Sequence, residues 1–138
     1  MKKNLFKKLV TGVLATSLGV VALTGCGAKE TSDKGNQAYR TLDEIKESGE
    51  INIGVFSDKN PFGYVDDNGD YQGYDVYFAE RLGKDLGVKI NYVSTEAANR
   101  VEYLETGKVD VVLANFTVTD ERAEKVDFAL PYMNVALG

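Results

Sequence analysis

The side chains best suited to hold a small anion lie between Asn115 and Arg122, directly after the apolar run 109–114. Hydroxyl and amide groups such as those of Asn115 and Thr117 can form hydrogen bonds, and free backbone N–H groups at a following helix start favour an anion. The planar guanidinium of Arg122 could hold a carboxylate through two parallel hydrogen bonds. It could equally form a surface ion pair with Asp120 or Glu121, and spacing alone favours neither interpretation.

Two earlier segments carry further candidates, each after its own apolar run: Lys59, Phe62, Asn99 and Arg100. The ring of Phe62 could stack on ligand carbon atoms, or it could fill the core beneath a hairpin. The ammonium group of Lys59 could face a ligand charge, or it could be solvated. Asn99 and Arg100 could contact a ligand, although an exposed position on a helix is the default interpretation for both.

The composition excludes several kinds of chemistry. The 138 residues, about one domain, include no histidine and one cysteine, so the chain has no Ser–His–Asp triad, no Cys–His zinc site and no intrachain disulfide. It has no glycine-rich phosphate loop, and its carboxylates lack metal-loop spacing. The net charge is −5, and the acidic bulk of the chain disfavours nucleic acid. We therefore expect a small-ligand site without catalysis, metal or cofactor.

The first 26 residues have the pattern of an exported lipoprotein. A basic head and the apolar run 9–23, shorter than a membrane span of about 20 residues, are typical of a signal peptide, although an uncleaved anchor is the alternative. Leu23–Cys26 resembles a bacterial lipobox, which implies that Cys26 carries a lipid and becomes the mature N-terminus. We expect a signal peptide at 1–25, an anchor and flexible tether at 26–40, and a folded part at 41–138.

The folded part alternates between strand and helix patterns. Strands are predicted at 51–56, 88–94, 109–114 and 132–137, and a hairpin joins 62–65 to 71–72 across a turn at 66–69. Helices are predicted at 42–48, 76–86, 97–106 and 119–125. The spacing of Thr41 and Glu44 predicts a capping box, Asp75 is expected to cap the second helix, and Gly87 to end it.

This order of elements predicts the fold class α/β, with a mainly parallel sheet flanked by helices and right-handed crossovers. Ligands of such sheets bind outside the carboxyl ends of the strands. The candidate residues follow the strands predicted at 51–56, 88–94 and 109–114. We therefore expect three loops to meet at one edge of the sheet.

Four motifs, in order, resemble the signature of family 3 bacterial extracellular solute-binding proteins: Gly73–Leu82, Gly107–Val111, Asn115–Arg122 and Val126–Tyr132. The resemblance runs from about Leu42 to the last residue. It departs from the signature at Tyr77, where the family usually has an acidic residue that is not a ligand contact.

The resemblance implies a periplasmic-binding-protein-like fold of type II and roles for the candidate residues. Arg122 is expected to bind the α-carboxylate of an amino acid, with help from Thr117. The other expected contacts are Asn115 beside them, Lys59 and Phe62 in the segment of the aromatic wall, and Asn99 and Arg100 in the segment that senses the ligand side chain.

The resemblance also implies a function: a monomeric, lipid-anchored receptor outside the cytoplasm that delivers an amino acid to the permease of an ABC importer. The motifs are most similar to a cysteine-binding subgroup, with aspartate, glutamate and glutamine binders as the alternative. A dehydratase and a sensor lobe on the same fold are further alternatives. Because family members have two lobes, we expect residues 41–138 to be the first lobe, incomplete, with the second absent.

Overall fold

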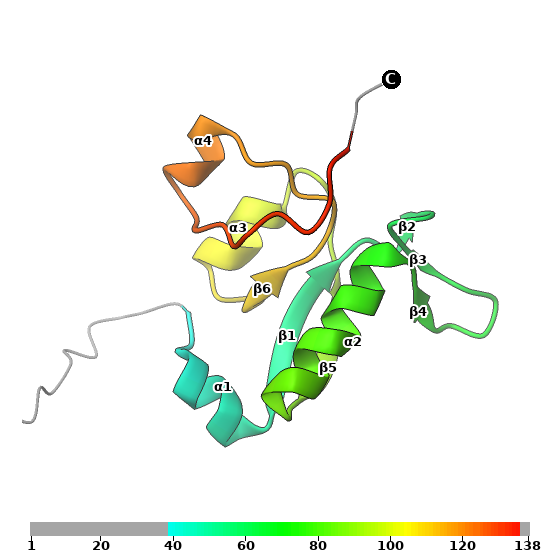
Figure 1. Ribbon diagram of the computed structural model, residues 1–138, viewed down its shortest axis with the longest axis horizontal. Helices are drawn as coiled ribbons and strands as arrows, with labels where there is room; N and C mark the ends of the chain where they lie inside the picture. Colours follow the sequence, from blue (N-terminus) through cyan, green and yellow to red (C-terminus); the bar gives the residue numbers. More distant parts are fainter. Residues whose placement is uncertain (1–38, 136–138) are drawn as a thin grey trace, which may run out of the picture. The chain divides into compact units, whose positions relative to one another are not determined.

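The computed structural model describes residues 39–135 (Figure 1). The predicted signal peptide, Cys26 and most of the tether lie outside these residues. The elements are α1 (Leu42–Ser48), β1 (Glu50–Val55), β2 (Asp58–Lys59), β3 (Gly63–Val65), β4 (Tyr71–Gln72), α2 (Tyr74–Leu86), β5 (Lys89–Ser94), α3 (Arg100–Glu105), β6 (Val111–Val112) and α4 (Asp120–Ala123). None of the helices described is long and apolar enough to cross a membrane.

A parallel three-stranded sheet in the order β5-β1-β6 forms the centre of the fold. Ile53 of β1 pairs with Tyr92 of β5 on one side and with Val111 of β6 on the other. A second, antiparallel sheet in the order β2-β3-β4 contains the predicted hairpin. Because all three strands of the first sheet run in the same direction, the segments that follow them leave from the same edge.

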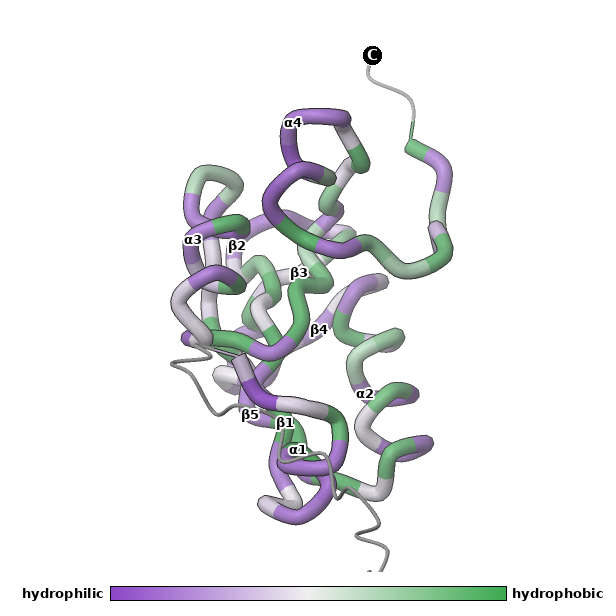
Figure 2. Tube along the Cα trace, turned by 90° about the vertical axis from the view of Figure 1, so that its left-hand side faces the viewer, coloured by the Kyte–Doolittle hydropathy of each residue, from purple (hydrophilic) through white to green (hydrophobic). Residues whose placement is uncertain are grey.

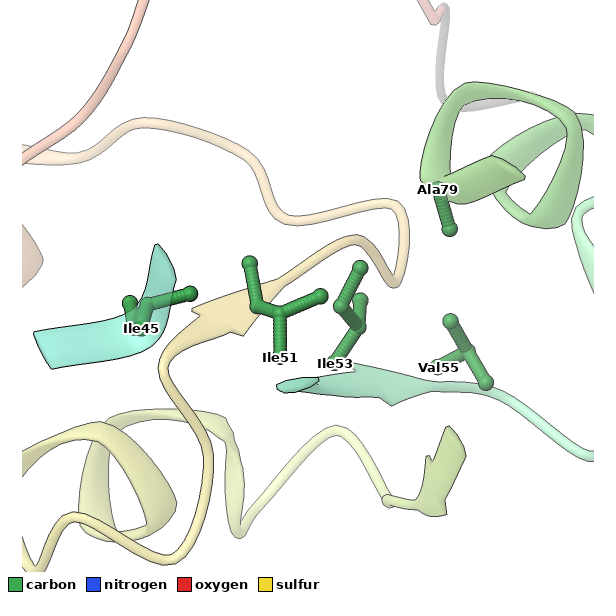
Figure 3. Packing of buried hydrophobic residues seen from close by; sticks show 5 residues of the cluster. All are labelled: Ile45, Ile51, Ile53, Val55 and Ala79. Carbon is green, nitrogen blue, oxygen red and sulfur yellow. The ribbon is translucent and has the colours of Figure 1, made fainter. Parts of the chain in front are cut away.

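The core lies on one face of β1. Ile51, Ile53 and Val55 alternate along the strand, so their side chains share a face, and each is at most 1% exposed. Figure 3 shows these three side chains with Ala79 of α2 pointing towards them and Ile45 of α1 at one end of the row. Burial of each isoleucine or valine side chain stabilises the fold by about 1.5–3 kcal/mol.

The short helix α4 differs from these core elements, because Figure 2 shows it as mostly hydrophilic.

The helix ends confirm two predictions made from local sequence. Thr41 Oγ1 accepts a hydrogen bond from the backbone N–H of Glu44, and the Glu44 carboxylate accepts one from the backbone N–H of Thr41, which completes the capping box. At the end of α2, Gly87 adopts the left-handed conformation with φ +71°.

The start of α2 corrects a third prediction, because Asp75 does not cap the helix. The N-cap is Gly73, which makes no side-chain cap hydrogen bond, and Asp75 lies inside the first turn. Gly73 has φ +123°, and a Cβ atom added there would lie 2.3 Å from the carbonyl oxygen of Phe62. Only glycine fits this position, and the Asp75 carboxylate serves another purpose, described below.

Three further predicted elements differ from the structure. The strand predicted at 109–114 pairs only at Val111 and Val112, and these residues are half-buried rather than enclosed on both faces. The helix predicted at 97–106 begins at Arg100. No strand forms at residues 132–135, the described part of the strand predicted at 132–137.

Asp110 fastens the start of β6 to the N-terminal side of the sheet. Its carboxylate accepts hydrogen bonds from the Arg40 guanidinium and, at 2.7 Å, from the backbone N–H of Asn52. The Asp110 side chain is only 4% exposed, whereas that of Arg40 is 32% exposed. The bond with Asp110 raises the pKa of Arg40. This contact fixes the register of β6 against β1, and with it the loop that follows β6.

Candidate functional site

The three loops meet at the side chain of Arg100, which is 6% exposed. Its Nε donates to the carbonyl oxygen of Ala97 at 3.1 Å, in the segment after β5. Its Nη1 donates to the carbonyl oxygens of Ala114 and Asn115, both at 2.9 Å, in the segment after β6. Its Cζ lies 5.7 Å from the ring centroid of Phe56, which follows β1. One guanidinium thus joins the segments behind all three parallel strands.

A second guanidinium lies nearby, on Arg122 of α4. Its Nη1 donates to the carbonyl oxygen of Thr117 at 2.7 Å. Its Cζ lies 5.1 Å from the ring centroid of Phe116, and the Cζ of Arg100 lies 4.6 Å from the same centroid. Such cation–π contacts stabilise a charged group over an aromatic face. Phe116 therefore connects the two arginines.

Neither arginine is paired with a carboxylate in the part of the chain that the structure describes. The ion pairs found there are Arg40–Asp110, Lys59–Asp58 and Arg81–Asp85. The alternative of an ion pair between Arg122 and a neighbouring acidic residue is therefore not realised. Burial lowers the pKa of Arg100, and the positive charge of Arg122 lowers it further. Since an anion would offset both effects, this edge of the sheet is suited to bind one.

Four of the seven predicted site residues are brought together by direct hydrogen bonds: Asn115 with Arg100, and Thr117 with Arg122. Both bonds use backbone carbonyl oxygens, so the side chains of Asn115 and Thr117 remain available. Asn115 has φ +44°, an uncommon conformation for a residue with a Cβ atom. The anion contact predicted for backbone N–H groups at the start of α4 stays a prediction, and the N–H of Arg122 itself donates to the Thr119 hydroxyl.

The other three predicted residues lie at the margin of this group. Lys59 is exposed and forms an ion pair with Asp58, of a kind that contributes about 0–1 kcal/mol. Its Nζ lies 6.0 Å from the ring centroid of Phe56. Phe62 is half-buried, and its carbonyl oxygen accepts the backbone N–H of Asp75 at 2.9 Å. Asn99 is the N-cap of α3 without a side-chain cap bond.

Sequence reasoning missed the two phenylalanine rings that contact the arginines, Phe56 and Phe116. Phe116 lies between two predicted contact residues, and an aromatic beside an arginine is the signal that could have identified it. Phe56 was interpreted as the last residue of a strand, and its contact with Arg100 spans 44 positions of sequence, which no local pattern reveals.

Two further buried groups were also missed. The Asp75 carboxylate accepts hydrogen bonds from the backbone N–H of Asn115 at 2.9 Å and from the Tyr132 hydroxyl at 2.7 Å. Burial raises the pKa of Asp75, and these two bonds oppose the rise. Burial also raises the pKa of Tyr132, and the bond to Asp75 adds to this. Both residues lie in motifs quoted above, but their positions in the chain do not reveal their pairing.

A hollow of about 490 Å³ runs beside this site, along β6 and the segment 127–135. Asn115, Phe116 and Thr117 line it, but Arg100 and Arg122 do not. We place the candidate site at the arginines rather than in the hollow, because two guanidinium groups lie close together there with no carboxylate partner among residues 39–135. Among residues 39–135, no group of three or more acidic or cysteine side chains is placed to hold a metal ion.

Comparison with known proteins identifies relatives along most of the described chain. The family model described as "Bacterial extracellular solute-binding proteins, family 3" matches residues 51–137. The chain is 32% identical over 129 residues to the L-cystine-binding protein TcyJ of Escherichia coli, covering 94% of this chain and 45% of that protein. It is also 33% identical over 92 residues to the cyclohexadienyl dehydratase of Pseudomonas aeruginosa, covering 67% and 34% of the two chains.

A solved structure gives a similar result. The solute receptor for L-cysteine of Neisseria gonorrhoeae is 64% identical in sequence with a TM-score of 0.67, over 68% of this chain and 39% of that chain. The chain thus spans less than half the length of the relatives named here.

Proposed function

The chain belongs to family 3 of the bacterial extracellular solute-binding proteins, and from this premise we propose that it is the receptor of an amino-acid importer. The observation that carries the proposal is the pair of guanidinium groups, Arg100 and Arg122, that no carboxylate neutralises within residues 39–135. Free amino acids all bring a carboxylate. The predicted periplasmic-binding-protein-like fold of type II is confirmed by the likeness to solved receptors.

In this proposal Arg122 makes the main contact with the ligand α-carboxylate. Its Nη1 is held by the Thr117 carbonyl, which leaves the other donors of the guanidinium for a ligand. The Thr117 hydroxyl and the Asn115 amide assist it from the same loop. Lys59, Phe62, Asn99 and Arg100 surround the rest of the ligand, from the segments after β1 and β5.

The proposed ligand is a polar amino acid, with cysteine favoured. The support is that relatives over most of this chain are named for binding L-cystine and L-cysteine. Aspartate, glutamate and glutamine are the alternatives. We further propose that the described residues belong to one lobe of a two-lobe receptor, which acts as a monomer outside the cytoplasm and delivers its ligand to an ABC permease.

A dehydratase is the second candidate, since the P. aeruginosa relative is named for that activity. The sequence contains no histidine to act as a general acid or base. The two arginines can bind a carboxylate but are poor proton donors, because a guanidinium does not lose its proton in proteins. Binding without reaction is therefore the simpler use of this site. Turnover of a cyclohexadienyl substrate by the purified protein would reverse this preference.

A thermal-shift screen of the full-length gene product against the common L-amino acids and cystine tests the proposal. A ligand at 100 times its dissociation constant adds about 2.7 kcal/mol of stability, which is about 5–10 °C in Tm for a domain of 150–250 residues. We expect such a shift with cysteine or with one of the alternatives. The α-methyl ester of the same amino acid, which lacks the α-carboxylate, is the control and should give no shift. A screen in which no amino acid raises Tm would contradict the proposed function.

We also propose that Cys26 carries the lipid that holds the receptor at the membrane. The support is the basic head, the short apolar run and the lipobox-like Leu23–Cys26. Cys26→Ser is expected to abolish incorporation of radiolabelled palmitate into the protein in bacterial cells, since the thiol of the lipobox-like motif is lost. The matched control Ser17→Ala should be labelled like the wild type. Equal labelling of Cys26→Ser and wild type would disprove the lipid assignment.

A further inference from the structure

The Asp75 side chain is a buried carboxylate without a cation beside it in the described part of the chain. It is 0% exposed, and its two oxygen atoms accept hydrogen bonds from different segments: Oδ2 from the backbone of Asn115 and Oδ1 from the hydroxyl of Tyr132. A buried charge is tolerated only where such donors satisfy it. Its position in the first turn of the 13-residue helix α2 also stabilises negative charge, since the helix dipole is positive there.

The first bond holds the loop that carries the candidate site. Asn115 has φ +44°, a left-handed conformation that asparagine adopts more readily than most residues with a Cβ atom. Here its N–H donates to Asp75 and its carbonyl oxygen accepts from Arg100. The next residue, Phe116, contacts both arginines. The backbone conformation of Asn115 therefore sets where the Phe116 ring lies between Arg100 and Arg122.

The second bond holds the segment 124–135, which contains no helix or strand. The Tyr132 ring lies 4.7 Å from the ring centroid of Phe78 and 6.2 Å from that of Tyr74, both on α2. The Tyr74 hydroxyl donates to the Tyr132 carbonyl oxygen at 3.4 Å. Asp75 adds the hydrogen bond at the buried end of the ring. The same carboxylate thus anchors two segments that no strand pairing connects.

We propose that Asp75 is a positioning residue of the ligand site: its carboxylate orients the loop 115–122 through Asn115 and fastens the segment 124–135 to α2 through Tyr132, without touching the ligand. The effect on ligand affinity rests on the function proposed above. The structural part does not, because it concerns hydrogen bonds within the free protein.

Amide hydrogen exchange of the ¹⁵N-labelled full-length gene product tests the structural part without any ligand. In the wild type we expect the Asn115 amide to be protected. In Asp75→Asn its exchange should be faster by about tenfold or more, because the neutral amide replaces a charged acceptor and offers one acceptor oxygen to two donors. The matched control is Asp85→Asn on the same helix, whose carboxylate is 59% exposed, and it should leave the Asn115 amide unchanged. An unprotected Asn115 amide in the wild type, or full protection in Asp75→Asn, would overturn the proposal.

Tyr132→Phe decides the question if Asp75→Asn does not fold, because it removes only one hydroxyl. Without the Tyr132 hydroxyl, the Asp75 carboxylate keeps the Asn115 N–H as a donor, and the geometry of that hydrogen bond should change. The chemical shift of the Asn115 amide should therefore change as well. Tyr77→Phe, on the exposed side of α2, is the control and should not move it. An unchanged Asn115 amide resonance in Tyr132→Phe would show that the Asp75 carboxylate does not link Asn115 to Tyr132.

The ligand part is tested with the amino acid that gives a shift in the thermal screen. We expect Asp75→Asn to weaken its binding by about tenfold or more, and Asp85→Asn to leave it unchanged. If the Asn115 amide of Asp75→Asn loses its protection but the variant keeps wild-type affinity, Asp75 does not position the ligand site, and the proposed function stands. If the wild type binds no amino acid, the proposed function fails and the exchange result still decides the structural part.

Discussion

Replacing Arg122 with alanine is expected to weaken amino-acid binding by about 30-fold to several thousand-fold, which corresponds to about 2–5 kcal/mol. The reason is that the ligand carboxylate would lose a charge-assisted contact with two hydrogen bonds, and within residues 39–135 the one other guanidinium at the site is that of the buried Arg100. The effect on folding should be small, since the Arg122 side chain makes one exposed hydrogen bond to Thr117 and one contact with the Phe116 ring. Isothermal titration calorimetry on the full-length gene product, with the ligand found by the thermal screen, measures the change.

Two companion variants make this experiment specific. Arg122→Lys keeps the charge but loses the planar fork, and it should also bind poorly. Arg81→Ala removes an arginine that is 65% exposed on α2 and paired with Asp85, so its affinity should equal that of the wild type. If both Arg122 variants bind with near-normal affinity, Arg122 is not the carboxylate contact.

Replacing Arg100 with methionine should lower the free energy of unfolding by about 3 kcal/mol or more, even without ligand. The substitution keeps a long apolar stem but removes the donors to the carbonyl oxygens of Ala97, Ala114 and Asn115. A buried acceptor left without a partner costs about 1–3 kcal/mol, and the contacts with Phe56 and Phe116 are lost as well. Denaturant titration followed by circular dichroism measures the loss.

Arg100→Lys should recover only part of this stability, because an ammonium group cannot reach both sides of the loop as a guanidinium does. Arg81→Met serves as the control for removing an arginine and should change the free energy of unfolding by about 0–1 kcal/mol. An unfolding midpoint for Arg100→Met equal to that of the wild type would show that the loops do not depend on this side chain.

Those features of the fold that depend on neighbouring residues could be predicted from the sequence. The capping box of α1 involves Thr41 and Glu44, three positions apart, and the end of α2 depends on Gly87 alone. The three loops could also be predicted to meet, because a parallel sheet sends the carboxyl ends of its strands to one edge. The family resemblance has the same basis, since its motifs are short and contiguous.

The features that were predicted wrongly depend on distant partners. Asp75 was interpreted as a cap because aspartate before a helix usually is one, whereas its partners Asn115 and Tyr132 lie 40 and 57 positions away. Arg100 was expected to be exposed by default, but α3 begins at this residue, and its side chain reaches Ala114, 14 positions away. The strand predicted at 109–114 was too long, because apolar residues at the edge of a sheet need not all pair.

The central position of β1 determines the order in which this domain can fold as the ribosome makes it. Asn52 of β1 is synthesised 39 positions before its partner Asn91 and 58 positions before its partner Asp110. At about 5–20 residues synthesised per second, β5 follows β1 after roughly 2–8 s and β6 follows it after roughly 3–12 s. Before β5 is made, α1 and α2 are the helices of the described chain that are available to cover β1. The loop after β6, which leads to Arg122 on α4, is therefore added to a scaffold in which α2 and β5 are already present.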